Sequence, residues 1–340
     1  MEGEAGFQLL RPGSRNRLIR WFLLRTLQAI ATLLAALVVI FFLMRVLPGD
    51  PVPIIIGDRQ VSPEEIARLR ARYCLDCPLP QQFVRFVSSA ARGDLGTSIR
   101  YSRPVTQLIG EHVWPTVVLG ATVLLINFTV GVALGAWQGV RKGRLVDRLL
   151  SSFSLLAYAL PTFWLALILI WVFSIRLRWF PAAGYISPDL PPGAGALTLA
   201  LDVAKHMVLP VATLCIVSIA ATMRYQRNAM IEVLRMDYVR TARAKGLTGR
   251  QVIVHHAWRN ALFPVLTIFG LWLPILATGS VFVESVFSLN GLGLLAYDAI
   301  GSRDYPLLMG SAILVSSLIV CGGLITDVGY MVLDPRMRRS

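Results

Sequence analysis

Residues 116–140 read TVVLGATVLLINFTVGVALGAWQGV and contain no charged side chain. A helix needs roughly 20 predominantly apolar residues to cross about 30 Å of hydrocarbon, and this run is long enough to do so. A run of this length predicts a membrane-spanning helix rather than a helix of a soluble core. The sequence therefore indicates that lipid surrounds this part of the chain.

Further long apolar runs follow, and the chain as a whole is apolar. Of its 340 residues, 55% are hydrophobic and 15% are charged, whereas about a quarter of the residues of a soluble domain are charged. The other runs that qualify as spans are residues 21–44, 149–175, 207–223, 262–282 and 305–332. The sequence thus predicts an all-α membrane protein with six transmembrane helices.

The spans divide the chain into a membrane core and flanking segments. The predicted segments are 1–20 (cytoplasmic tail), 21–47 (first transmembrane helix), 48–115 (extracytoplasmic helical region), 116–332 (five-helix transmembrane core with a loop at 224–261) and 333–340 (cytoplasmic C-terminal tail). In the extracytoplasmic region, Ser62-Pro63-Glu64-Glu65 is typical of a helix start, and a second helix with an apolar face is predicted at 80–91. A further outward loop is predicted at 176–205.

The distribution of positive charge predicts the orientation. The chain has 33 Lys and Arg residues and a net charge of +14, and cytoplasmic loops of membrane proteins carry an excess of these residues. Most of them lie in the N-terminal tail, in 141–148, in 224–259 and in 336–339, whereas the opposite short loops hold only Arg176, Arg178, Lys205 and Arg303. We therefore expect both termini on the cytoplasmic side of the membrane. Nucleic-acid binding is the weaker explanation, because no basic, aromatic-bearing folded module is visible.

Glycines and prolines inside the spans predict local features. Gly131, Gly135 and Gly139 lie on one helix face, where they allow a neighbouring backbone to approach closely. Prolines in a span remove a backbone hydrogen bond and can kink the helix. These prolines are Pro161, Pro210 and Pro274.

The largest cytoplasmic loop contains the most informative stretch. Residues 237–264 read DYVRTARAKGLTGRQVIVHHAWRNALFP, which predicts an amphipathic helix, a glycine stop and a second helix. Gly246 can adopt the left-handed conformation that ends the first helix, and Thr248 can cap the second. The alternative is a solvated basic connector whose cations only satisfy the topology rule.

This loop resembles the cytoplasmic coupling loop of binding-protein-dependent ABC importer permeases, in the dipeptide and oligopeptide branch. Other motifs resemble that branch in order and spacing: LPGDP at 47–51, GDLGTS at 93–98, YALPTFW at 158–164, VFSLNGLG at 286–293, RDYP at 303–306 and LDPR at 333–336. The resemblance covers nearly the whole chain from about residue 20. It departs at Arg240-Thr241-Ala242, where the general importer loop has Glu-Ala-Ala, so the acidic contact of other branches is not carried over.

The resemblance implies a type I importer permease that forms half of a pathway for di- or oligopeptides. A coupling helix around 247–255 would dock on a cytoplasmic ATPase. The residues assigned to the ATPase-coupling loop are Arg240, Thr241, Ala242, Ala244, Lys245, Gly246, Leu247, Thr248, Val252, His255, Arg259 and Asn260. The implied partners are a second homologous permease subunit, two ABC ATPase subunits and an extracytoplasmic solute-binding protein.

No catalytic or cofactor site is predicted. The chain has no Gly-x-x-x-x-Gly-Lys-Ser/Thr phosphate loop, so ATP and Mg would be bound by partner subunits and hydrolysed there. The adjacent His255 and His256 cannot both face one metal on a helix. Cys74 and Cys77 lie in the outward region, where a local disulfide is one of the open alternatives.

Glu284, at the outer end of the fifth predicted span, is the pathway candidate, because an ionisable residue at membrane depth is a functional candidate by default. The alternative is that its carboxylate is solvated in the headgroup region or paired with an arginine. Asn127 and His206 are weaker candidates.

Other functions remain open from the sequence alone. A permease of the same type could carry another solute, such as glutathione, a nickel chelate or haem. A secondary transporter without ATPase partners is the alternative of a different class, but it often shows inverted repeats, and none is found here.

Overall fold

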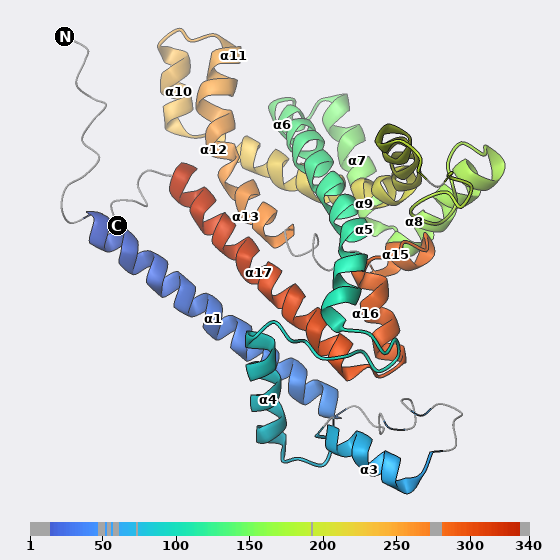
Figure 1. Ribbon diagram of the computed structural model, residues 1–340. Coiled ribbons are helices and arrows are strands. Elements are labelled where there is room, and N and C mark those ends of the chain that lie inside the picture. Colours follow the sequence, from blue (N-terminus) through green and yellow to red (C-terminus); the bar gives the residue numbers. More distant parts are fainter. Residues whose placement is uncertain are drawn as a thin grey trace.

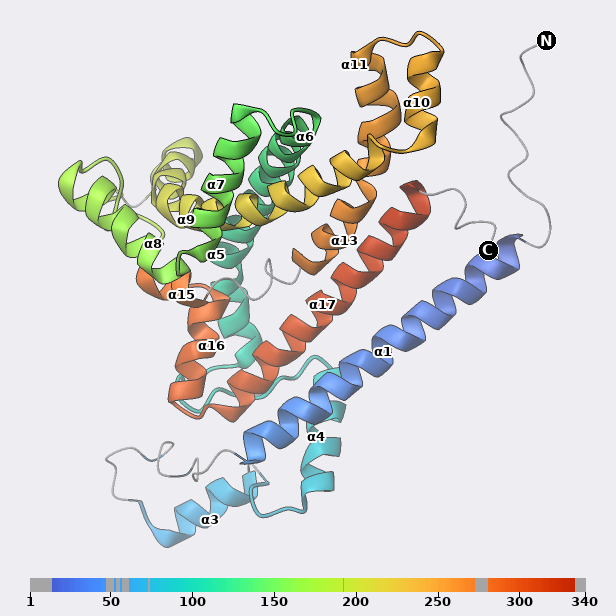
Figure 2. The same ribbon diagram turned by 180° about the vertical axis from the view of Figure 1, so that it is seen from behind.

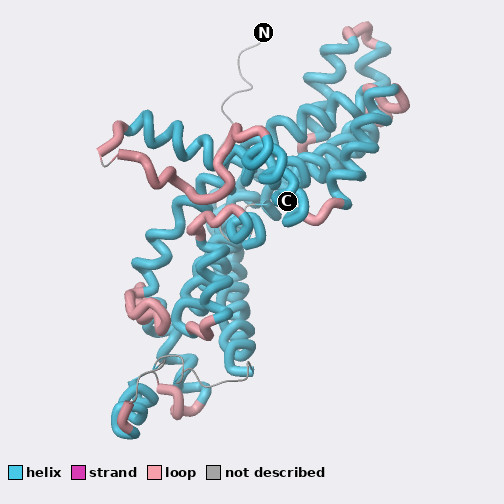
Figure 3. The backbone as a smooth tube through the Cα atoms, turned by 90° about the vertical axis from the view of Figure 1, so that its right-hand side faces the viewer, coloured by secondary structure: helices cyan, strands magenta, loops and turns pink. Residues whose placement is uncertain are grey.

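The computed structural model describes residues 14–46, 52, 56, 61–72, 74–191, 193–272 and 281–333. Helices dominate these residues (Figure 3), and one isolated bridge joins Thr97 to Pro104. The helices are α1 (Ser14–Val46), α3 (Pro63–Arg72), α4 (Leu79–Ala91), α5 (Val105–Ile126), η1 (Asn127–Gly131, a π-helix), α6 (Val132–Val140), α7 (Leu145–Ala159), α8 (Thr162–Leu169), η2 (Ile170–Arg176, π), α9 (Ala196–Val233), α10 (Asp237–Ala244), α11 (Gly249–Gln251), η3 (Val252–Trp258, π), α12 (Arg259–Ala261), α13 (Phe263–Trp272), α15 (Val281–Val286), α16 (Leu292–Gly301) and α17 (Tyr305–Leu333). The all-helical fold class is confirmed.

Four continuous helical segments of the described chain are long and apolar enough to cross a membrane. They are Leu23–Leu43, Val105–Val140, Ala196–Val233 and Tyr305–Asp327. A bent pair, Leu145–Ala159 with Thr162–Arg176, makes a fifth if it counts as one span. The predicted span at 262–282 is only partly described, because residues 273–280, which include Pro274, lie outside the described residues.

The predicted span at 149–175 is broken at Pro161, one of the prolines that the sequence predicts can kink a helix. The helix axis turns by 101° between α7 and α8. Leu160, at the break, has an extended backbone (φ −77°, ψ 130°), as expected for a residue that precedes a proline. Pro161, which has no amide hydrogen, stands just before the first residue of α8. Pro161 therefore breaks this helix, whereas Pro210 lies inside the continuous helix α9.

The boundaries predicted for the fourth span, 207–223, are too narrow. Helix α9 runs from Ala196 to Val233, so the final third of the loop predicted at 176–205 is helical. An apolar-run criterion detects only the part of a helix that is apolar throughout. Asp202, Lys205 and His206 interrupt the apolar run in the first third of α9. The carboxylate of Asp202 accepts hydrogen bonds from the amide (2.7 Å) and the hydroxyl (2.6 Å) of Ser187, which ties this part of α9 to the preceding loop.

The glycine face of α6 packs on α9, as the spacing predicts. A Cβ atom at Gly135 would lie 2.5 Å from the carbonyl oxygen of Met223, and one at Gly139 would lie 2.9 Å from that of Arg227. Neither distance leaves room for a side chain. Glycine at both positions lets the two backbones touch.

The main apolar core lies where α5, α8, α9 and α15 meet. Its buried members include Leu119, Ala166, Leu209 and Val283. Helix α1 lies apart from this core and runs beside α17 (Figures 1 and 2), to which it is joined by an ion pair between Arg25 and Asp327 at 3.1 Å. The core therefore fixes α9 against α5, α8 and α15.

The region between α1 and α5 contains the two predicted helices, α3 and α4. The hydroxyl of Ser62 accepts a hydrogen bond from the amide of Glu65 at 3.2 Å, which caps α3. The apolar face of α4 packs on α1 through Phe83 and Phe41, whose ring centroids are 5.3 Å apart. The region thus packs against the membrane helix that precedes it.

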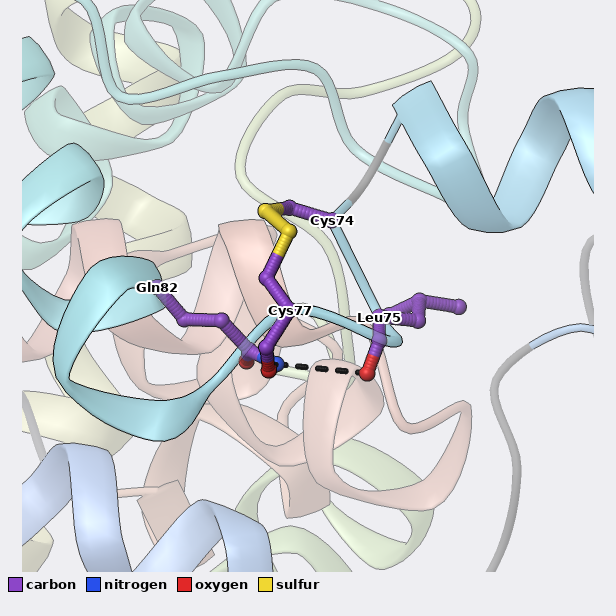
Figure 4. Close-up of a disulfide and its surroundings, with 4 residues drawn as sticks. All are labelled: Cys74, Leu75, Cys77 and Gln82. Atoms are coloured by element: carbon purple, nitrogen blue, oxygen red, sulfur yellow. Dashed lines mark hydrogen bonds between the residues drawn. A yellow bond between two sulfur atoms is a disulfide. The ribbon is translucent and has the colours of Figure 1, made fainter.

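A disulfide joins Cys74 and Cys77 in the turn between α3 and α4 (Figure 4), with their Cα atoms 5.2 Å apart. The side-chain amide of Gln82 donates to the carbonyl oxygens of Leu75 (3.2 Å) and Cys77 (2.8 Å). Arg70 donates to the carboxylate of Asp76 at 2.7 Å, and this hydrogen bond holds the pKa of Asp76 below its usual value. The turn is therefore cross-linked to both helices that flank it.

The two ends of the molecule differ. The hairpin formed by α10–α12, the start of α1 and the end of α17 lie at one end, and α3 and α4 lie at the other (Figures 1 and 2). The α6–α7 turn, which carries Arg141, Lys142 and Arg144, points toward the same end as the hairpin.

Candidate functional site

The candidate site is the helical hairpin at Asp237–Ala261, which projects from the end of α9 (Figure 1). Its inner faces close on a small apolar cluster in which Val239, Ala242 and Val252 are buried, with Leu234 and Leu247 packed against them. The apolar positions of α10 point inward and its polar positions point to solvent, which is the pattern of an amphipathic helix. The hairpin therefore has its own core.

The turn of the hairpin has the geometry that the sequence predicts. Gly246 has φ +81°, a conformation that costs a residue with a Cβ atom free energy. The amide of Gly246 donates to the carbonyl of Arg243 at 3.0 Å, so the end of α10 is closed. Thr248 then caps the next helix, because its hydroxyl accepts from the amide of Gln251 while the Gln251 side chain accepts from the amide of Thr248.

The base of the hairpin is fixed to α9. Ala257 and Ala261 pack against Met230 and Val233 at the end of α9, and small side chains at these contacts bring the helices close together. Across the hairpin, the side-chain amide of Asn260 donates to the hydroxyl of Tyr238 at 2.7 Å. The hairpin and α9 therefore form one packed unit.

The predicted coupling-loop residues divide between the interior and the surface of the hairpin. Ala242 and Val252 are buried, and Leu247 is half-buried. The others are exposed: Arg240, Thr241, Ala244, Lys245, Gly246, Thr248, His255, Arg259 and Asn260. The exposed surface is strongly basic, and the acidic side chain of Asp237 lies 3.6 Å from Arg240. Two faces result, an apolar one that holds the hairpin on α9 and a cationic one that is available to a partner.

Comparison with known families decides what kind of protein carries this hairpin. Residues 131–339 match the family described as binding-protein-dependent transport system inner membrane component, and residues 18–118 match the N-terminal region of such membrane components. The chain belongs to this family. It is thus a transport permease of the inner membrane rather than an enzyme, and its four or five candidate spans make it a multi-pass protein.

The permease is similar over almost its whole length to bacterial relatives. It is 37% identical over 327 residues to a putative peptide permease protein of Brucella suis biovar 1, with 94% of this chain and 99% of the relative covered. It is 37% identical to the di/tripeptide transport system permease protein of Pseudomonas aeruginosa, with 92% and 96% covered. It is 35% identical to the dipeptide transport system permease protein of Escherichia coli K12, with 94% and 99% covered.

The structure contains an ion pair near the hairpin that the sequence did not predict. Arg227 of α9 donates to both carboxylate oxygens of Asp147 in α7, at 2.6 and 2.9 Å. The same carboxylate accepts from the amide of Gly143 at 2.8 Å, and the side-chain amide of Gln138 donates to the Asp147 carbonyl at 3.1 Å. One signal was available, since Asp147 is the lone acidic residue in the basic segment 141–148 of the permease. The pair ties α9, which carries the hairpin, to the α6–α7 turn.

At the other end of the permease, two of the quoted motifs meet. The hydroxyl of Ser98 in the GDLGTS motif donates to the carboxylate of Asp304 in the RDYP motif. The same carboxylate accepts from the amides of Arg100 (3.1 Å) and Leu307 (3.2 Å). Asp304 is fully buried, so this carboxylate joins the segment before α5 to the start of α17.

Glu284 lies in an environment that differs from the alternative reading, in which its carboxylate is solvated or paired with an arginine. Its side chain is fully buried, and its carboxylate accepts from the hydroxyl of Thr116 (2.8 Å) and the amide of Leu294 (3.0 Å). The Thr116 hydroxyl in turn accepts from the amide of Leu292 at 2.8 Å. The headgroup solvation and the arginine partner expected for Glu284 are therefore replaced by contacts with α5 and with the first turn of α16. This arrangement holds three elements together, and the proposed pathway role of Glu284 stays a prediction.

Proposed function

We propose that this permease is one of two membrane subunits of an ATP-driven importer for short peptides. We also propose that the hairpin Asp237–Ala261 is the docking site for a cytoplasmic ATPase subunit. The observation that carries this proposal is the construction of the hairpin. It has a buried apolar core, a base packed on α9, and an exposed cationic face that no other described element covers. A surface of this kind fits a docked partner better than a flexible connector.

The coupling mechanism follows from the stiffness of this unit. ATP shifts an assembly between two states only if it binds one of them better, and that preference reaches the membrane through rigid contacts. The hairpin is packed on α9, and α9 spans the apolar core. A displacement of the docked ATPase is thus transmitted along α9 to the helices that line the pathway.

The substrate and partners are inferred from the relatives. Relatives along nearly the full length are named as permeases for peptides, dipeptides and di- or tripeptides, so we infer a short peptide as the solute. The family description names a binding protein on which transport depends. We infer that a second homologous permease completes the pathway, and that two ATPase subunits bind ATP and Mg.

The proposed topology has six spans of the type I importer permease, with both termini and the hairpin in the cytoplasm. The arrangement of the helices supports it, because the start of α1, the end of α17 and the basic hairpin lie at the same end. The predicted span at 262–282, of which residues 262–272 and 281–282 are described, supplies the sixth. Helices α3 and α4 then lie outside, where the Cys74–Cys77 disulfide is stable in an oxidising compartment.

Reconstitution of the importer tests this function. The permease is placed in proteoliposomes with its partner permease, both ATPases and the binding protein, and uptake of a radiolabelled dipeptide is followed. We expect uptake only with ATP on the hairpin side, and no uptake when an ATPase that cannot hydrolyse ATP is used. Uptake by the permease alone, driven by a proton gradient, would overturn the proposal in favour of a secondary transporter.

A further inference from the structure

Three polar side chains between α9 and the η1–α6 segment are buried and have no hydrogen-bond partner among the residues that the structure describes. Asn127, Thr222 and Gln226 are each 0% exposed. Within the part of the chain that the structure describes, neither amide atom of Asn127 or Gln226 has a partner, and neither does the Thr222 hydroxyl. Elsewhere on α9, Thr213 donates to the carbonyl of Leu209 at 2.8 Å. The lack of a partner is thus not general for polar residues of this helix.

The three side chains form one cluster, which we call the polar seam. Thr222 and Gln226 are one turn apart on α9, so they lie on the same face. A Cβ atom added at Gly131 would lie 3.2 Å from the Oδ1 atom of Asn127 and 3.2 Å from the Cβ atom of Thr222. A Cβ atom added at Gly135 would lie 2.8 Å from the Cβ atom of Gln226. All three side chains therefore border the same glycine face of η1 and α6.

Gly131 differs from the other glycines of this face. At Gly135 the nearest neighbour of an added Cβ atom is the backbone oxygen of Met223 at 2.5 Å, whereas at Gly131 no neighbour is nearer than 3.2 Å. Gly131 also ends the π-helix η1, in which the turn is wider than in an α-helix. Close backbone contact explains Gly135, whereas a Cβ atom at Gly131 would crowd the side chains of Asn127 and Thr222.

Buried polar groups in proteins are almost always paired with protein atoms or with ordered water. A buried water typically makes about three hydrogen bonds to such groups, and the seam offers amide donors, amide acceptors and a hydroxyl. A metal ion fits poorly, because the three side chains are uncharged and bring no carboxylate or imidazole. The contacts between α6 and α9 also enclose the seam too tightly for a peptide.

We propose that the polar seam of Asn127, Thr222 and Gln226 is a binding site for ordered water at membrane depth, between α9 and the η1–α6 segment. Water-mediated hydrogen bonds can exchange partners without being lost, so they tolerate a small displacement of α9 against α6. The site rests on the burial and pairing of these side chains. It does not depend on the identity of the transported solute.

Radiolytic labelling of buried methionines tests the site. Met223 follows Thr222 and is 0% exposed, and Met207 is 4% exposed within the main apolar core. The intact importer, in lipid nanodiscs and H2¹⁸O, is exposed to millisecond X-ray pulses, and ¹⁸O-labelled sulfoxide is measured by mass spectrometry. Water in the seam generates hydroxyl radicals beside Met223. We expect severalfold faster labelling of Met223 than of Met207.

Two outcomes would overturn the site: equal labelling of the two methionines, which would mean general solvent entry, or labelling of neither. The variant Asn127→Leu, Thr222→Val, Gln226→Leu should lose the label at Met223 and keep that at Met207 unchanged. If this variant does not assemble, the wild-type importer supplies a second measurement. A cryo-EM map that resolves waters should show density within hydrogen-bond distance of the Asn127 and Gln226 amides, and empty density there would also overturn the proposal.

Discussion

The guanidinium group of Arg227 donates two hydrogen bonds to the carboxylate of Asp147, at 2.6 and 2.9 Å, and so joins α9 to α7 beside the base of the hairpin. The side chains of Arg227 and Asp147 are only 23% and 6% exposed. A cation and an anion with so little solvent contact depend on each other, because either one alone would remain desolvated without compensation.

We predict that Asp147→Asn destabilises the permease by about 3 kcal/mol, because it leaves the Arg227 charge without its partner. The measurement is the thermal midpoint of the purified importer by scanning fluorimetry. Asp189→Asn, at an exposed loop position, is the control and should change stability by less than about 0.5 kcal/mol. Equal midpoints for the two variants would show that the ion pair contributes nothing.

Gly246→Val should uncouple transport from ATP hydrolysis. The φ of +81° at Gly246 costs a residue with a Cβ atom about 1–2 kcal/mol, and a β-branched residue more, so the turn of the hairpin is distorted. Insertion into the membrane should be unchanged. The ratio of peptide transported to ATP hydrolysed in proteoliposomes checks this.

Gly249→Val is the matched control for the hairpin turn. Gly249 lacks a positive φ, and an added Cβ atom there meets nothing within 4 Å. This variant should keep most of the wild-type ratio of peptide transported to ATP hydrolysed. Full coupling in Gly246→Val, or equal loss in both variants, would contradict the role of the turn.

Thr116→Val should destabilise the permease without changing its substrate preference. The substitution removes the hydroxyl that donates to Glu284 and accepts from the amide of Leu292, and each buried group left unpaired costs about 1–3 kcal/mol. The thermal midpoint and competition among dipeptides of different charge are the two measurements. An altered charge preference at an unchanged midpoint would instead place Glu284 in the peptide pathway.

Two glycine-to-alanine changes should act in opposite directions. Gly135→Ala puts a Cβ atom 2.5 Å from the Met223 carbonyl oxygen, and such overpacking costs about 1–3 kcal/mol. Gly110→Ala, in helix α5, meets nothing within 4 Å and should stabilise by about 0.5–1 kcal/mol through helix propensity. The two thermal midpoints, measured side by side, check the pair. A neutral Gly135→Ala would mean that α6 and α9 are less closely packed than the structure has them.

Loss of the Cys74–Cys77 disulfide should loosen the outward turn alone. In the chain-entropy description, closing so short a loop lowers the entropy of the unfolded chain and stabilises the fold by about 2 kcal/mol. Replacing both cysteines by serine should therefore speed proteolysis between α3 and α4, with little effect on the thermal midpoint of the membrane core. When the wild-type protein is isolated from an oxidising compartment and alkylated without prior reduction, mass spectrometry should find Cys74 and Cys77 unalkylated. Free thiols there would contradict the bond.

Features that depend on neighbouring residues could be predicted from the sequence. Apolar runs predicted the membrane helices, Ser62 and Thr248 marked helix starts, and Gly246 marked the end of α10, because capping and backbone conformation depend on neighbours in the chain. The spacing of Gly135 and Gly139 predicted close packing on another helix. It did not say which helix.

The partners of the buried charges could not be predicted from the sequence and are known from the packed structure. Asp147 meets Arg227, Ser98 meets Asp304 and Thr116 meets Glu284, and each pair is brought together by the packing of separate helices. The contact that joins the start of α9 to the preceding loop, Ser187 with Asp202, also came only from the structure. Local periodicity reports how one helix is built, whereas a hydrogen bond between distant residues depends on the way the helices pack.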